Sequence, residues 1–190
     1  MKANLLRTLA MALLGASLLV VAAPTAVLAE ERTCRGTLGS ITVDNLRVPK
    51  GAHCDLRGTY VKGTIKVGAN AVMRAFNVRV VGNVQGENSK KVVVRNGSRV
   101  GGSVQVVHGG VVKVLDSRIN GDILVDDNSR LQNLRRNVVG GNIQAFQNTG
   151  GVEIYRNRVD GNLQCKENRP RPVGANNVVQ GNKEDQCRGF

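Results

Sequence analysis

The sequence predicts an all-β protein that folds as one parallel β-helix of about seven coils, with one coil for each glycine interval of 19 or 20 positions. Three observations predict this fold: glycine recurs at a nearly constant interval, the columns beside it alternate between aliphatic and polar residues, and the cysteines are about one interval apart. The pattern never inverts between copies, which argues against hairpins, and one interval leaves no room for a crossover helix. An open sheet or sandwich of short strands is the main alternative.

The start of the chain, positions 1–29, predicts a secretory signal peptide. Lys2 and Arg7 give a charged start, Leu9–Ala23 is apolar, and positions 27–29 fit a small-residue cleavage site. The apolar run is short compared with the roughly 20 residues of a membrane-spanning helix. We therefore expect a mature domain from Glu30 to Phe190, without a transmembrane anchor after cleavage, that is secreted or on the cell surface.

The composition is strongly basic. Lysine and arginine number 27 against 14 acidic residues, and the loss of two basic residues with the signal leaves 25 − 14 = +11. A basic exported protein meets polyanions such as acidic polysaccharides, although the same charge also keeps a protein soluble.

The repeat has a glycine anchor and flanking columns that predict one buried face. Two residues before each anchor is a β-branched residue, and two after it is an aliphatic residue in all copies except the one with Lys183. Asp44 occupies the glycine slot of an earlier copy. Alternation of this kind indicates a strand with one buried face, and equivalent strands then stack in parallel about 4.8 Å apart. The anchors are Gly63, Gly82, Gly102, Gly121, Gly141, Gly161 and Gly181.

Each anchor predicts a corner of the coil. Glycine fits where a side chain would crowd the turn, and the small polar residue that follows can bond the backbone from one rung to the next. Parallel connections are overwhelmingly right-handed, and the period is longer than that of left-handed coils built from three hexapeptides, so we expect a right-handed coil.

The cysteine spacing predicts the disulfides. The positions of Cys34 and Cys54 differ by 20, and those of Cys165 and Cys187 differ by 22, so each pair spans one coil. We predict Cys34–Cys54 and Cys165–Cys187, because the other pairings would join opposite ends of the rod. These bonds would clamp the first and last coils, whose open strand edges invite association.

Two outward columns are candidate binding sites. Aligned arginines repel by about 1 kcal/mol per pair in water, so this column is either a stripe that binds an extended polyanion or a solvated face whose stems cover apolar rungs. Glutamines could bond sugar hydroxyls or pair with each other from coil to coil. The arginines are Arg79, Arg99, Arg118 and Arg158, and the glutamines are Gln85, Gln105, Gln144 and Gln164.

Signatures of an enzyme are weak. Asp122, Asp126 and Asp160 each align with uncharged residues one coil away, so paired carboxylates are not expected. The only histidines, His53 and His108, are about three coils apart, so we expect no metal site and no cofactor. The aromatic residues are only two Tyr and three Phe, so we expect no specific nucleic-acid partner.

Rungs such as GSVQV (102–106) and GNIQA (141–145) resemble those of secreted bacterial right-handed β-helix proteins. The closing GNLQCKENRPRP…GNKEDQC is similar to a group of small exported bacterial proteins without a characterised function. The resemblance implies the fold and export, and it implies no catalytic residues. Bactofilins are a more distant likeness: they stack β-helices into filaments but lack export signals and these disulfides.

Together these features predict an exported, monomeric, non-enzymatic β-helix. We expect it to contact an anionic polysaccharide or cell-wall polymer through the arginine side. A self-assembling structural protein is the first alternative, and a polysaccharide lyase or hydrolase is the second.

Overall fold

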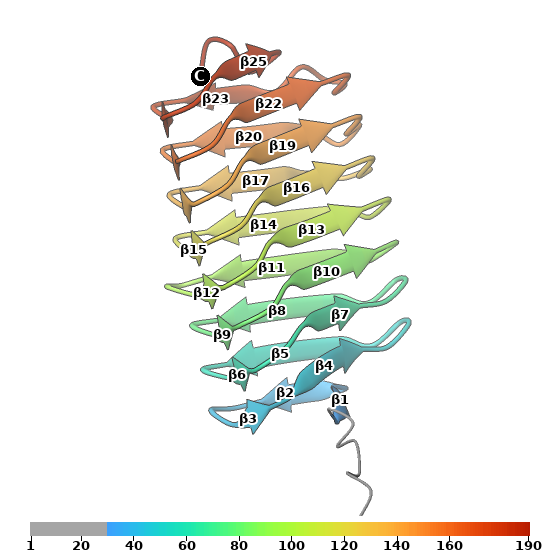
Figure 1. The fold of residues 1–190 in the computed structure, drawn as a ribbon. Coiled ribbons are helices and arrows are strands. Elements are labelled where there is room, and N and C mark those ends of the chain that lie inside the picture. Colours follow the sequence, from blue (N-terminus) through green and yellow to red (C-terminus); the bar gives the residue numbers. More distant parts are fainter. Residues whose placement is uncertain (1–29) are drawn as a thin grey trace, which may run out of the picture.

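Three parallel sheets run along the axis of the protein, and each coil contributes one strand to each sheet (Figure 1). The structure, a computed structural model, describes residues 30–190. The predicted signal peptide, residues 1–29, lies outside the described residues.

Sheet A has nine strands. In spatial order they are β1 (Glu31–Thr33), β4 (Asn45–Val48), β7 (Ile65–Val67), β10 (Val84–Glu87), β13 (Val104–Val107), β16 (Ile123–Asp126), β19 (Ile143–Phe146), β22 (Leu163–Lys166) and β25 (Lys183–Asp185).

Sheet B has eight strands. They are β2 (Gly36–Leu38), β5 (His53–Arg57), β8 (Val72–Phe76), β11 (Lys91–Arg95), β14 (Val111–Leu115), β17 (Gln132–Arg135), β20 (Val152–Tyr155) and β23 (Val173–Ala175).

Sheet C also has eight strands, and they are short. They are β3 (Thr42–Val43), β6 (Tyr60–Val61), β9 (Arg79–Val80), β12 (Arg99–Val100), β15 (Arg118–Ile119), β18 (Val138–Val139), β21 (Arg158–Val159) and β24 (Val178–Val179).

The coil is right-handed, as expected. In Figure 1 the near strands of sheet A point to the right, the fainter strands of sheet B point to the left, and the chain climbs from the blue end to the red end. The fold class is therefore confirmed, with about one coil more than expected. The glycine pattern does not mark the first coil, because β1, β2 and β3 lie before Asp44, which already replaces glycine in the earliest copy.

The core consists of stacked aliphatic columns. Val100 pairs directly with Val80 on one side and with Ile119 on the other, and all three side chains are buried. The predicted column of sheet A is also buried, and it contains Leu46, Ile65, Val84, Val104, Ile123, Ile143 and Leu163. Residues about one interval apart are thus direct neighbours.

The glycine anchors lie where neighbouring coils approach closely, which confirms their predicted role. A Cβ on Gly102 would clash with Asn83 Oδ1 and would lie 3.0 Å from the carbonyl oxygen of Gly82. The Oδ1 atom of Asn83 accepts a hydrogen bond of 2.8 Å from the backbone N–H of Ser103. The same rung-to-rung bond recurs along the column Asn45, Thr64, Asn83, Ser103, Asp122, Asn142, Asn162 and Asn182.

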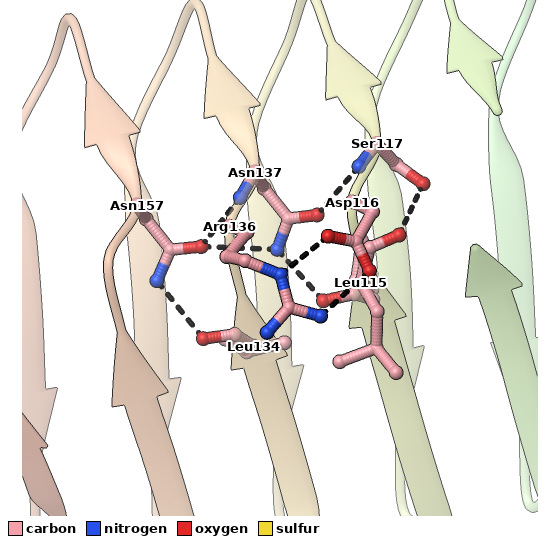
Figure 2. A network of polar contacts seen from close by, with 8 residues as sticks. Leu115, Asp116, Ser117, Leu134, Arg136, Asn137 and Asn157 are labelled. Atoms are coloured by element: carbon pink, nitrogen blue, oxygen red, sulfur yellow. Dashed lines mark hydrogen bonds and ion pairs between the residues drawn. The ribbon is translucent and has the colours of Figure 1, made fainter. Parts of the chain in front are cut away.

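Two further polar ladders are buried at the other corners, and the sequence did not reveal them. At the corner between sheets B and C, Asn157 Oδ1 accepts hydrogen bonds of 3.0 Å from both the backbone N–H and the side-chain Nδ2 of Asn137. Asn157 Nδ2 in turn donates to the carbonyl of Leu134 at 2.9 Å (Figure 2). The corner between sheets A and B repeats the arrangement with Asn128, Asn148 and Asn168.

Both predicted disulfides are confirmed. Cys34 is bonded to Cys54 with a Cα–Cα distance of 5.7 Å, and Cys165 is bonded to Cys187 at 5.3 Å. Each bond joins one coil to the next at one end of the protein. The carboxyl-terminal end is covered further by Phe190, whose ring occupies the space beside Gly174.

Candidate polyanion-binding edge

The predicted arginine column follows the outer face of sheet C. Arg99 lies opposite Arg79 on one side and Arg118 on the other, and all three are exposed. Val138 separates them from Arg158, the fourth predicted member. None of these four arginines forms an ion pair with another described residue. The alignment is confirmed, whereas ligand binding stays a prediction.

Two neighbouring columns add more arginines to the same corner of the coil. One is the last outward column of sheet B, and the other is the turn residue that follows it. We call these arginines, together with the sheet C column, the basic edge. Its members are Arg57, Arg79, Arg95, Arg99, Arg118, Arg135, Arg136, Arg156 and Arg158.

Within the described chain, arginine is the only basic residue in these three columns, which contain no lysine. Asp116 is their only acidic residue. Arginine presents a planar fork of donors that matches carboxylate, sulfate and phosphate groups, whereas the lysine ammonium is a point charge. The edge is therefore suited to recognising oxyanions.

Three of the aromatic residues stack on arginines of this edge. The ring of Phe76 lies between two guanidinium groups, with Arg57 at 5.1 Å and Arg95 at 4.7 Å from its centroid. Arg79 lies 5.2 Å from the ring centroid of Tyr60, and Arg135 lies 4.8 Å from that of Tyr155. The small number of aromatic residues does not predict this stacking, because it depends on the column in which they lie. The equal spacing of Arg57, Phe76 and Arg95 was the available signal.

The turn column is fixed by the buried ladder beneath it. Arg136 precedes Asn137 and has a left-handed backbone with φ of 55°, so its side chain points out while Asn137 points in (Figure 2). Arg136 Nη2 donates a hydrogen bond of 2.8 Å to Asp116 Oδ2 in the preceding coil. This hydrogen bond lowers the pKa of Asp116 below its usual value, so the carboxylate remains ionised at neutral pH.

The glutamine column lies on the outer face of sheet A. Gln144 Nε2 donates to Gln164 Oε1 at 2.9 Å, and Gln85 Nε2 approaches Gln105 Oε1 at 3.5 Å. Pairing between rungs, one of the two expected uses of these amides, is therefore present. Leu124 separates the two pairs.

Gln85 and Gln105 also line a shallow groove of about 790 Å³ near the amino-terminal end of sheet A. Arg47 and Lys66 lie on the same wall, and Glu31 and Glu87 supply negative charge. The mixed signs make this groove a weaker candidate for a polyanion than the basic edge.

The carboxylates and histidines are dispersed. Within residues 30–190, no group of three or more His, Cys, Asp or Glu is arranged to hold a metal ion. Asp126 is partly buried on sheet A, and its burial, followed by the charge of Asp127, raises its pKa. His108 Nε2 lies 3.9 Å from Asp127 Oδ2 on the exposed turn.

Fold and site together define the class of this protein: a disulfide-closed, right-handed parallel β-helix with one arginine-rich edge. Comparisons with protein-family models, with curated proteins and with solved structures find no match to the chain. The described part of the chain, 30–190, contains no apolar helix of membrane-spanning length.

Proposed function

We propose that this protein is an exported, non-enzymatic binding module that holds an anionic polysaccharide along its basic edge. Two disulfides are typical of extracellular proteins, which supports export. The observation that carries the binding proposal is the vertical alignment of Arg79, Arg99 and Arg118.

The three aligned arginines have no acidic side chain of the described chain paired with them, which favours binding of an external anion. Neighbouring strands of a parallel sheet are about 4.8 Å apart, so the three guanidinium groups repel each other unless anionic groups lie between them. No described acidic side chain pairs with them, whereas Asp116 pairs with Arg136 and Glu153 pairs with Arg135. The unpaired arginines are thus the cations that an incoming polymer would meet.

The shape of the edge favours a long, linear ligand. The column runs along the axis of the coil because each strand pairs in register with the strand one coil away. A polysaccharide with one carboxylate per sugar offers charges at a repeat similar to the rung spacing, so one chain could contact several rungs. Several weak contacts along one chain add up, although each exposed pair contributes only about 0.2–1 kcal/mol.

The test is retention on immobilised polygalacturonate in a salt gradient. We expect Arg79→Gln/Arg99→Gln/Arg118→Gln to weaken binding roughly tenfold, since three such contacts amount to about 0.6–3 kcal/mol. The substitutions are at exposed positions, so circular dichroism should be unchanged.

The matched control removes the same charge elsewhere. Lys50→Gln/Lys90→Gln/Lys166→Gln also loses three positive charges, but these exposed lysines lie near the opposite corner of the coil, between sheets A and B. Equal weakening in both triple variants would show that net charge alone governs retention and would overturn the proposed site. Failure of the unaltered mature protein to bind at low salt would overturn the function.

A further inference from the structure

A small pocket opens at the carboxyl-terminal part of the basic edge, at the corner between sheets B and C. Its volume is about 330 Å³, and it lies across three successive coils. The lining residues are Arg135, Arg136, Tyr155, Arg156, Ala175 and Asn176.

The ring of Tyr155 stacks against an arginine in the preceding coil and has only a small side chain at the paired position in the following coil. Arg135, one coil before, covers one face at 4.8 Å from the ring centroid. One coil after, Ala175 occupies the paired position, and its methyl group is too small to cover the other face. Phe76 in the same column has arginines on both faces, so its ring is closed to a ligand.

Two arginines beside this ring occupy a backbone conformation that favours other residues. Arg136 and Arg156 both have φ of 55°, in the left-handed region. Such a conformation costs an ordinary residue on the order of 1 kcal/mol, and Gly and Asn adopt it most easily. The equivalent positions in other coils are Gly58, Asn77, Asn96, Asp116 and Asn176. Arginine does not stabilise the backbone at these two positions, so we attribute its presence to what the guanidinium group contacts.

Arg156 is the available cation of the pocket. Arg136 is held by Asp116, and Arg135 is held by Glu153 at 2.6 Å. Arg156 is exposed and forms no ion pair with the described residues.

We propose that this pocket binds a single uronic acid unit of the polysaccharide. The proposal rests on the function above and names the sugar class that the edge selects. The apolar face of the pyranose ring stacks on the open face of Tyr155, as aromatic rings accept both apolar and weakly positive C–H surfaces. The carboxylate pairs with Arg156, and the Asn176 amide lines the same pocket, where it can meet a hydroxyl group.

The test uses a probe too short to span the edge, namely trigalacturonate, in titration calorimetry or NMR. Arg156→Asn is the informative variant, because Asn occupies the same left-handed position at Asn77 and Asn96 and keeps the backbone unchanged. We expect Arg156→Asn and Tyr155→Ala each to weaken trigalacturonate binding at least fivefold.

Two controls match these variants. Arg130→Asn removes an exposed arginine at the corner between sheets A and B, and Phe76→Ala removes an aromatic ring from the same column as Tyr155. Both should bind trigalacturonate like the unaltered protein. If Arg130→Asn weakened trigalacturonate binding as much as Arg156→Asn, or Phe76→Ala as much as Tyr155→Ala, the proposed binding site would be wrong.

Competition distinguishes a sugar site from a general anion site. We expect inorganic sulfate at the same concentration to leave trigalacturonate bound, because sulfate cannot use the Tyr155 ring. Full displacement by sulfate would overturn the proposal. Normal trigalacturonate binding by Arg156→Asn and Tyr155→Ala would also overturn it, while the loss of polymer retention in the Arg79, Arg99 and Arg118 variant would still support the general function.

Discussion

At the scale of single residues, buried asparagine holds the corners of the coil. Its amide oxygen accepts from a backbone N–H of the preceding coil, and its amide nitrogen donates to a backbone carbonyl of that same coil, so the polar groups of a tight corner are bonded within the protein. Buried polar groups that lose their partner cost about 1–3 kcal/mol each. The ladders therefore stabilise the stack as much by preventing unbonded groups as by forming bonds.

We predict that Asn157→Ala lowers the free energy of unfolding by roughly 2–4 kcal/mol. The substitution leaves the N–H of Asn137 and the carbonyl of Leu134 without their side-chain partners in a buried corner. Urea or thermal unfolding would measure the change.

The control for this prediction is Asn120→Ala. Asn120 is exposed at the corner between sheets C and A, and its side chain has no hydrogen bond within the described structure. We expect a change within about 0.5 kcal/mol. A similarly small effect of Asn157→Ala would show that the ladder adds little.

The sequence indicated some of these polar residues and not others. The column after each glycine was predicted because glycine marks it in every copy. The ladder of Asn137, Asn157 and Asn177 was missed because earlier coils place Thr59, Val78, Ser98 and Ser117 there. A column that changes from Val to Asn has no constant residue type, although every member is buried.

At the scale of strands and turns, register is kept while the number of residues per coil varies. The coil that contains Asn96 has one extra turn residue, Gly97, with φ of 75°, and a Cβ added there would meet no atom closer than 3.9 Å. Beyond this turn, Arg99 again lies opposite Arg79. The variation in coil length is thus absorbed at corners.

We predict that deletion of Gly97 is tolerated, with a change in unfolding free energy within about 1 kcal/mol, as for other changes away from the core. The shortened turn would place Ser98 directly after a left-handed Asn96, as Ser117 follows Asp116 in the next coil. Circular dichroism and thermal unfolding would measure the outcome.

Deletion of Gln105 is the contrasting case. It removes one residue from the middle of β13, and a shift by one residue moves the following side chains to the opposite face. We expect loss of cooperative unfolding in that variant. If both deletions left the protein equally stable, the conclusion that only the corners accommodate changes in coil length would be wrong.

The buried columns of sheets A and C could be predicted, whereas the basic edge was only partly visible. A strand as short as Arg79–Val80 cannot show alternation by itself. The arginine column was found because it lies at a fixed offset from glycine. Arg136, Arg156 and Tyr155 were missed because their convergence depends on a left-handed turn that brings the outward faces of sheets B and C together.

At the scale of the whole molecule, the two ends are closed in different ways. The carboxyl-terminal end has a disulfide, Phe190 beside Gly174, and Gln186, whose Oε1 accepts from the N–H of Asn168 and so completes the buried ladder. At the amino-terminal end the disulfide joins the first two coils, and Leu38 and Val43 remain only partly buried.

We predict that Cys34→Ser/Cys54→Ser destabilises the first coil and leaves the later coils intact. A disulfide that closes a loop of this length contributes about 3 kcal/mol. Each coil contacts mainly its neighbours, so the loss should remain local.

Hydrogen exchange would measure this directly. The N–H of Cys34, which donates to the carbonyl of Arg47, should lose protection, while the N–H of Val104, which donates to the carbonyl of Asp122, should keep it. Uniform loss of protection through the molecule would show that the coils unfold together.

The vertical pairing of every strand with its counterpart one coil away makes each turn an interchangeable module. Duplication of a whole turn, cut between equivalent positions, would extend the rod by one step without rearranging its neighbours. Because the guanidinium row runs parallel to that direction, each added turn would extend the proposed binding edge by one rung.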